Sequence, residues 1–178
     1  MNDPNTGRPE PKPLVVSHPH LKEFLAFLPE LNKETDRGMV MIACSFIDEL
    51  MRRIVLSFLI EDTVSKSLVD GFNAPIGTFA TRSAAAFTLG LISEQELGEC
   101  DALRKIRRRF AHHVHVSFDD QNIRDLCKNL TMAAQDYGDV MVGARGQFST
   151  ASVALIMSLV NRPHYVSRKR LRFEHWPS

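Results

Sequence analysis

The run of cations and histidines between Ala102 and His115 contains the residues of this sequence best suited to chemistry. It reads ALRKIRRRFAHHVH, with five cationic residues in six positions and three histidines after them. Guanidinium and ammonium groups bind phosphates, and an imidazole can gain or lose a proton near neutral pH. Two interpretations follow: a solvated basic helix face, or a binding site for phosphate, nucleic acid or an acidic protein surface.

Apolar spacing predicts that this segment is helical, with Leu103, Ile106 and Phe110 on its buried face. The cations and histidines then stack four residues apart on two opposite exposed flanks: Arg104, Arg108 and His112 on one, and Lys105, Arg109 and His113 on the other. Of these we take Arg104, Arg108 and His112 as candidate binding residues.

Arg107 borders the buried face, and a guanidinium at the edge of a core needs a carboxylate partner. The long helix predicted earlier in the chain offers Asp48 and Glu49. Glu49 can pair with Arg53, four residues later on the helix surface, whereas Asp48 has apolar neighbours. We therefore predict an Asp48–Arg107 ion pair that orients two helices. A ligand-binding or catalytic role for Asp48, Glu49 and Arg107 is the alternative.

Metal and disulfide chemistry have little support in the sequence. His112 and His113 are adjacent and would point about 100° apart on a helix, and no HxxxH or HExxH spacing occurs. The three cysteines, Cys44, Cys100 and Cys127, are widely spaced and form no CxxC pair. We therefore predict no metal site, no cofactor, no disulfide and a cytoplasmic location.

Apolar periodicity along the whole chain predicts an all-α, single-domain bundle of about six to seven helices. The predicted helices cover residues 20–28, 35–60, 63–69, 78–89, 93–112, 120–130 and 148–160. Pro29 and Pro163 are expected to end the first and the last of them. Ser93 and Glu96 match a capping box, and residues 113–118 are expected to form a loop.

Composition and the ends of the chain set further limits. The 178 residues carry a formal net charge of +1, so nucleic acid would have to be bound by a local patch. We predict a disordered lead-in over residues 1–16, the bundle over 17–163 and a basic tail over 164–178. The cations of the tail are a second candidate contact with DNA: Arg168, Lys169, Arg170 and Arg172. No apolar run approaches the ~20 residues of a membrane helix, so we expect no membrane partner.

Three ordered blocks of the sequence resemble the mannitol operon repressor family of bacterial proteins. They are Arg37-Gly38 with residues 45–50 (SFIDEL), residues 72–79 (FNAPIGTF) with 89–92 (LGLI), and residues 106–112 (IRRRFAH). The family usually has Ile-Arg-Asn-x-Phe-Ala-His in the third block. The likeness covers about residues 35–130, and it implies an all-helical fold and repression of a sugar-alcohol operon.

A repressor would be expected to carry a helix-turn-helix, and residues 86–93 superficially fit its turn. The second helix would then begin at Ser93, and its first turns would meet the DNA. These turns carry Glu94, Glu96 and Glu99, whose carboxylates would repel phosphates. We therefore predict that no standard helix-turn-helix is present.

The spacing of Arg107 and His112 also resembles the Arg-x4-His motif of HEPN-type helical domains, some of which cleave RNA at a dimer interface. That resemblance implies a phosphate contact for Arg107 and a general base or positioning role for His112. Arg108 stands where that group normally has Asn, Asp or His, which disfavours cleavage.

We therefore predict a non-enzymatic transcriptional regulator that acts through protein–protein contacts or a basic surface. A homodimer or a complex with another regulatory protein is expected, because the long central helix is apolar around most of its circumference. Met39, Met41 and Met51 would add adaptable contact surface. The alternative is a HEPN-like RNA-binding or RNA-cleaving domain that uses Arg107 and His112.

Overall fold

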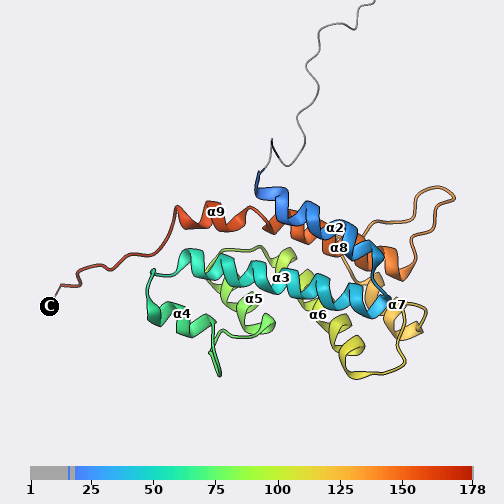
Figure 1. Ribbon diagram of the computed structural model, residues 1–178, viewed down its shortest axis with the longest axis horizontal. Coiled ribbons are helices and arrows are strands. Elements are labelled where there is room, and N and C mark those ends of the chain that lie inside the picture. Colours follow the sequence, from blue (N-terminus) through green and yellow to red (C-terminus); the bar gives the residue numbers. More distant parts are fainter. Residues whose placement is uncertain (1–15, 17–18, 178) are drawn as a thin grey trace, which may run out of the picture.

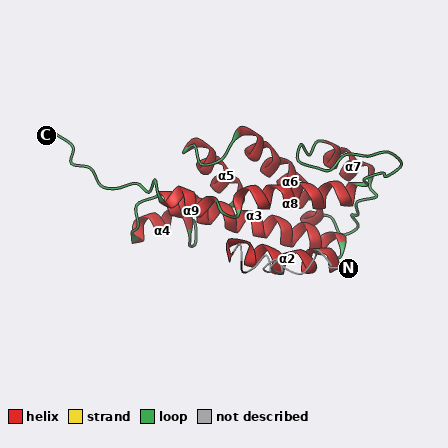
Figure 2. Ribbon diagram, turned by 90° about the horizontal axis from the view of Figure 1, so that it is seen from above, coloured by secondary structure: helices red, strands yellow, loops and turns green. Residues whose placement is uncertain are grey.

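The computed structural model describes Val16 and residues 19–177. The lead-in predicted over residues 1–16 therefore lies outside the described residues, except for Val16. The described part is all-α, as predicted, and within it the only extended pairing is a bridge between Tyr137 and Val140 (Figure 2). Its helices in chain order are η1 (Pro19–Leu21), α2 (Lys22–Lys33), α3 (Asp36–Phe58), α4 (Thr63–Val69), α5 (Phe79–Thr88), α6 (Glu94–His112), α7 (Gln121–Lys128), α8 (Ala144–Leu159) and α9 (Arg162–Ser167).

The core is built around α3, which lies between α2 and α8 on one side and α4, α5 and α6 on the other (Figure 1). Nine of its side chains are buried: Met39, Val40, Ala43, Cys44, Ile47, Leu50, Met51, Ile54 and Val55. Helices of the same chain therefore cover the apolar surface of α3. The premise that α3 needs a second copy of the chain is wrong, and Met39 and Met51 are core residues. The homodimer stays a prediction without support from α3.

Caps confirm the predicted starts of the two longest helices. Thr35 Oγ1 accepts a hydrogen bond from the backbone N–H of Gly38 at 3.1 Å at the start of α3. At the start of α6, Ser93 Oγ accepts from the N–H of Glu96 at 3.2 Å, and the Glu96 carboxylate accepts from the N–H of Ser93 at 2.8 Å. Gly90, with φ of +70°, follows the end of α5 in the left-handed conformation.

Of the two prolines expected to end helices, Pro29 does not end one, whereas α8 does end before Pro163, at Leu159. Pro29 lies inside α2, which continues to Lys33 and buries Leu31 completely. Burial of Phe24 and Leu31 against the core offsets the roughly 3 kcal/mol that an interior proline costs a helix. Pro163 lies in the first turn of α9, where its missing N–H breaks no helical hydrogen bond.

The buried face predicted for α6 is confirmed, because Leu103, Ile106 and Phe110 are all fully buried. The ring of Phe110 lies 5.1 Å from that of Phe118, which lies 5.5 Å from the ring of Phe148 on α8. Residues 113–118 form a loop, as expected. This aromatic row fixes the end of α6 and the loop against α8, and it leaves the opposite side of α6 facing solvent.

Candidate anion-binding site

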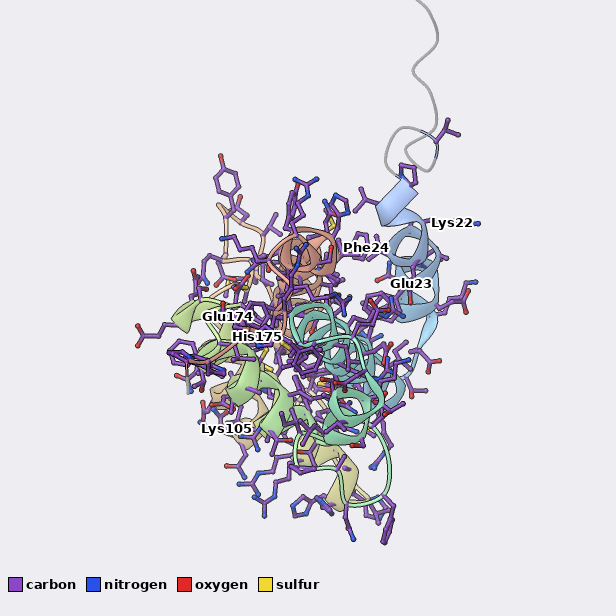
Figure 3. The ribbon with its side chains drawn as sticks, turned by 90° about the vertical axis from the view of Figure 1, so that its left-hand side faces the viewer. Lys22, Glu23, Phe24, Lys105, Glu174 and His175 are labelled. Carbon is purple, nitrogen blue, oxygen red and sulfur yellow. The ribbon has the colours of Figure 1, made fainter. Side chains whose placement is uncertain are left out.

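The C-terminal half of α6 presents its cations to solvent. The exposed cations and histidines of this half and of the next residue are Lys105, Arg108, Arg109, His112 and His113. Arg104 and Arg107 are half-buried. Figure 1 shows this end of α6 at the lower edge of the molecule, and Figure 3 shows Lys105 across the molecule from Lys22 of α2.

Three adjoining hollows surround this half of α6. The largest, of about 550 Å³, lies between α6 and α7 and is lined by Lys105, Arg108, Arg109, His112, His113 and Leu126. A hollow of about 350 Å³ shares Arg109 and His113 with it and continues past His115 to the start of α7. These two hollows together are called the α6–α7 groove below. The third, called the outer hollow, has about 240 Å³ and is lined by Arg104, Arg107, Arg108, Ala111 and His112.

Four of these cations are not neutralised by an acid. Within the described residues, no carboxylate lies within ion-pair distance of Lys105, Arg107, Arg108 or Arg109. Arg104 does have a partner, Asp101, at 2.9 Å. The whole chain carries +1, so its other residues together carry a net −3 when these four cations are set aside. A nearly neutral chain thus concentrates positive charge on one surface, which attracts polyanions.

Arg37 fixes the end of α6, a role that sequence reasoning did not assign to it. Its guanidinium donates hydrogen bonds to the carbonyl oxygens of Phe110, of His113 at 2.7 Å and of Val114 at 2.9 Å. The last carbonyls of a helix lack intrahelical donors and carry the negative end of its dipole. Arg37 therefore neutralises this helix end. The sequence marks Arg37 as a residue of interest through its place in the Arg37-Gly38 block.

The predicted Asp48–Arg107 ion pair is wrong. Asp48 instead accepts a hydrogen bond at 2.9 Å from Arg82 of α5, which also donates to the carbonyl of Val69 at 3.1 Å. The side chains of Arg82 and Asp48 are only 13% and 22% exposed, so this pair holds α5 on α3. Asp48 does face the edge of the core, but on the side of α3 that α5 covers. Arg107 lines the outer hollow.

Glu49 belongs to a structural network that begins beside this pair. It accepts hydrogen bonds from Arg53 at 2.9 Å, as predicted, and from Arg52 at 3.2 Å. Arg52 also binds both carboxylate oxygens of Asp70 at 2.6 Å, and Arg53 binds Glu23 at 2.6 Å. These hydrogen bonds hold the pKa values of Asp70 and Glu23 below their usual range. Asp48 therefore ties α5 to α3, and Glu49 contacts the two arginines of α3 that bind α2 and the end of α4.

The first turns of α6 are packed against the chain itself. Glu96 and Glu99 are 6% and 1% exposed. Glu96 accepts a hydrogen bond from Arg162 of α9 at 2.7 Å, and Glu99 accepts one from the N–H of Thr131 at 2.9 Å. These two carboxylates are therefore bound within the chain and do not lie on an exposed first turn. Since a recognition helix offers its first turns to the bases, their burial is a second reason against a helix-turn-helix.

The tail and α6 do not form one surface. The tail leaves the molecule at the end opposite to α7 (Figures 1 and 2). Arg170 donates to the carbonyl of Leu59 at 3.3 Å and pairs with Glu61 at 3.5 Å, so it helps to dock the tail on the end of α3. Arg168 lies over the ring of Tyr165 on α9. The candidate tail residues Arg168, Lys169, Arg170 and Arg172 therefore form a separate basic region.

The cysteines and the acidic residues offer little further chemistry. Burial raises the pKa of Cys44, Cys100 and Cys127 to about 12, so these thiols stay protonated and unreactive in the folded chain. In the part of the chain that the structure describes, no group of three or more His, Cys, Asp or Glu could hold a metal ion.

No described helix has the length and apolarity to cross a bilayer.

Comparison of the chain with protein-family models, with curated proteins and with solved structures found no match. The resemblance to mannitol operon repressors therefore rests on the three sequence blocks. In the structure, residues of these blocks serve the fold: Arg37 holds the end of α6, Asp48 joins α5 to α3, and Phe110 lies in the core.

Proposed function

We propose that this chain is a non-enzymatic transcriptional regulator, similar to the mannitol operon repressors, that contacts the phosphate backbone of nucleic acid through the C-terminal half of α6. One observation carries the proposal. The cations Lys105, Arg107, Arg108 and Arg109 crowd one half-helix without an acidic partner among the described residues. Like charges at this spacing repel one another, and binding of a polyanion relieves that repulsion.

The helix dipole does not account for these cations. Cations favour a helix C-terminus only within its last turn, and α6 ends at His112. Lys105, Arg107 and Arg108 lie before that turn, and Arg37 already binds the carbonyl of Phe110 in the last turn and those of His113 and Val114 just after it. An external anion is therefore the better explanation for this surface than a solvated basic face.

We also propose that the chain acts in the cytoplasm, as a homodimer or bound to another regulatory protein. The basic surface of α6 supplies the nucleic-acid contact without a standard helix-turn-helix. In this arrangement affinity comes from phosphates, and a partner or second copy would add specificity.

An electrophoretic mobility shift series at increasing salt, with a DNA duplex of promoter length and RNA of equal length, tests the nucleic-acid contact. We expect binding that weakens steeply as salt rises, because each phosphate contact releases counterions. The variant K105Q/R108Q/R109Q should lower the slope of log affinity against log salt by about 2 to 3, and its affinity at least about tenfold.

The variant K22Q/K33Q/K66Q is the matched control, since it makes the same change in net charge away from α6. Lys22 lies across the molecule from Lys105 (Figure 3). The control should bind as the wild type does. No salt-dependent binding by the wild type, or equal losses in the two variants, would contradict the proposal.

A second candidate function is RNA cleavage of the HEPN type. The observation in its favour is that Arg107 and His112 line the same outer hollow. A histidine there could take the proton of a 2′-hydroxyl group while the arginine stabilises charge on the phosphate. The hollow is open and shallow within one chain, so a second copy would have to complete the site.

A ribonuclease assay separates the two candidates. The enzyme hypothesis predicts that His112→Ala abolishes cleavage of single-stranded RNA, and that His175→Ala, in the exposed tail, leaves it unchanged. Equal background cleavage by the wild type and both variants would leave the non-enzymatic function as the one supported.

A further inference from the structure

We propose that the α6–α7 groove takes a single strand of nucleic acid, with its phosphates along α6 and a base against the side chain of Asn122 on α7. The inference rests on the proposed function, because it names the form of nucleic acid that the same basic surface binds. It adds Asn122 as a residue that contacts bases.

The two walls of the groove differ in chemistry. The α6 wall supplies Lys105 and Arg109, four residues apart on one flank. The other wall supplies the apolar side chain of Leu126 and, towards the start of α7, the amide of Asn122. Asp120 adds a negative charge at that end. Phosphates are therefore attracted to the α6 wall, while Leu126 and Asp120 offer them no favourable contact on the other wall, which leaves the bases to face α7.

Asn122 is the polar group on the α7 wall that can recognise a base. Its side chain is exposed, and it makes no hydrogen bond to any residue that the structure describes. The neighbouring Gln121, by contrast, donates a hydrogen bond to Asp125 at 2.8 Å. A free amide offers both a donor and an acceptor, which matches the pattern on a base edge.

The length of the groove suits a few nucleotides of one strand. At 1.5 Å of rise per residue, Lys105 and His113 are separated by about 12 Å along α6. This length accommodates about three to four stacked nucleotides at 3.4 Å each.

The position of Asn122 favours a single strand over a duplex. In a single strand the bases are free to turn into a concave site. A paired base would first have to leave its stack, which costs free energy. A duplex can therefore contact the exposed cations of α6 without placing a base in the groove between the two helices.

Fluorescence anisotropy with labelled oligonucleotides of about 12 nucleotides tests the inference. Single-stranded DNA and single-stranded RNA form two arms, and a DNA duplex of the same length forms the third, all at one salt concentration. We expect at least one single strand to bind about tenfold more tightly than the duplex. Asn122→Ala should weaken that binding about three- to tenfold and leave duplex binding unchanged.

Asn32→Ala, which removes an exposed amide from α2, is the matched control and should change neither affinity. Duplex binding equal to or tighter than both single strands would overturn the inference and leave the proposed function standing. Unchanged single-strand binding by Asn122→Ala would overturn it as well. The absence of any salt-dependent binding, by duplex and single strands alike, is a different result and contradicts the proposed function itself.

Discussion

At the residue scale, the ion pairs of α3 give the fold a measurable dependence on pH. Hydrogen bonds from Arg52 hold the pKa of Asp70 below its ordinary value of 3.8. A carboxyl group with a lowered pKa stabilises the fold above its unfolded pKa, and this contribution is lost as the pH falls through the folded pKa. We expect Asp70→Asn to lower the free energy of unfolding by about 1 kcal/mol at pH 7, since the pair is partly exposed. The difference in the free energy of unfolding between this variant and the wild type should disappear below about pH 4.

Urea unfolding from neutral to strongly acidic pH measures this gap. Asp125→Asn is the matched control, because Asp125 has only exposed contacts, a pair with Lys128 at 3.7 Å and a hydrogen bond from Gln121 at 2.8 Å that an asparagine oxygen can also accept. Its free energy of unfolding should differ little from that of the wild type at any pH. A gap for Asp70→Asn that persists or widens in acid would contradict the assigned pair.

The inward position of Asp48 could be predicted from its apolar neighbours, but its partner could not. Helical periodicity shows which face of α3 a residue occupies, and it does not show which helix covers that face. Arg82 lies in α5, among small and apolar residues that gave no sign of a buried ion pair. The burial of Glu96 likewise depends on Arg162, which is 66 positions away in the chain.

At the element scale, the end of α6 depends on Arg37 from α3. Arg37→Ala removes the donor for three carbonyl oxygens. We expect the free energy of unfolding to fall by about 1.5 to 3 kcal/mol, the range for a hydrogen bond to a charged group. Because the last turn of α6 would fray, affinity for nucleic acid should fall too. Urea unfolding and the anisotropy assay measure the two effects.

Arg124→Ala is the control for this variant, since Arg124 donates one exposed hydrogen bond to the carbonyl of Asp119. Its cost should be well under half that of Arg37→Ala. Arg37→Lys should be intermediate, because an ammonium group keeps the charge but lacks the planar fork of donors. If Arg37→Ala were no more harmful than Arg124→Ala, Arg37 would not hold this helix end.

Helix ends marked by local signals could be predicted closely, and ends set by packing could not. The side chains of Thr35 and Ser93 bond within their own first turns, so the sequence alone indicates where α3 and α6 begin. Pro29 is a local signal to stop, but the burial of Leu31 by distant residues outweighs it. Helix α9 is not predicted from the sequence, because Pro163 is expected to end a helix and instead lies in the first turn of one.

At the scale of the whole molecule, the all-α fold follows from apolar periodicity, whereas the candidate site depends on charges that remain without partners. The sequence shows where cations cluster along α6. It predicts the Glu49–Arg53 pair, but it does not show that Asp48 is bound to Arg82 and so cannot neutralise that cluster. Pairing between distant segments thus decides which surface of a nearly neutral chain is positive.

The contacts of the tail predict that it has a stabilising part and a free part. The N–H of Leu171 donates to the carbonyl of Phe58 at 2.8 Å, and Arg170 donates to that of Leu59, so both satisfy the end of α3. Beyond them, Phe173 and Trp176 are 81% and 82% exposed.

A chain that ends after Leu171 should unfold in urea as the full chain does. A chain that ends after residue 167 should lose about 1 to 3 kcal/mol, because carbonyls at the end of α3 lose their donors. Equal stability of the two shortened chains would mean that these contacts contribute nothing. A lower free energy of unfolding for the chain that ends after Leu171 would mean that Phe173 and Trp176 pack on the bundle.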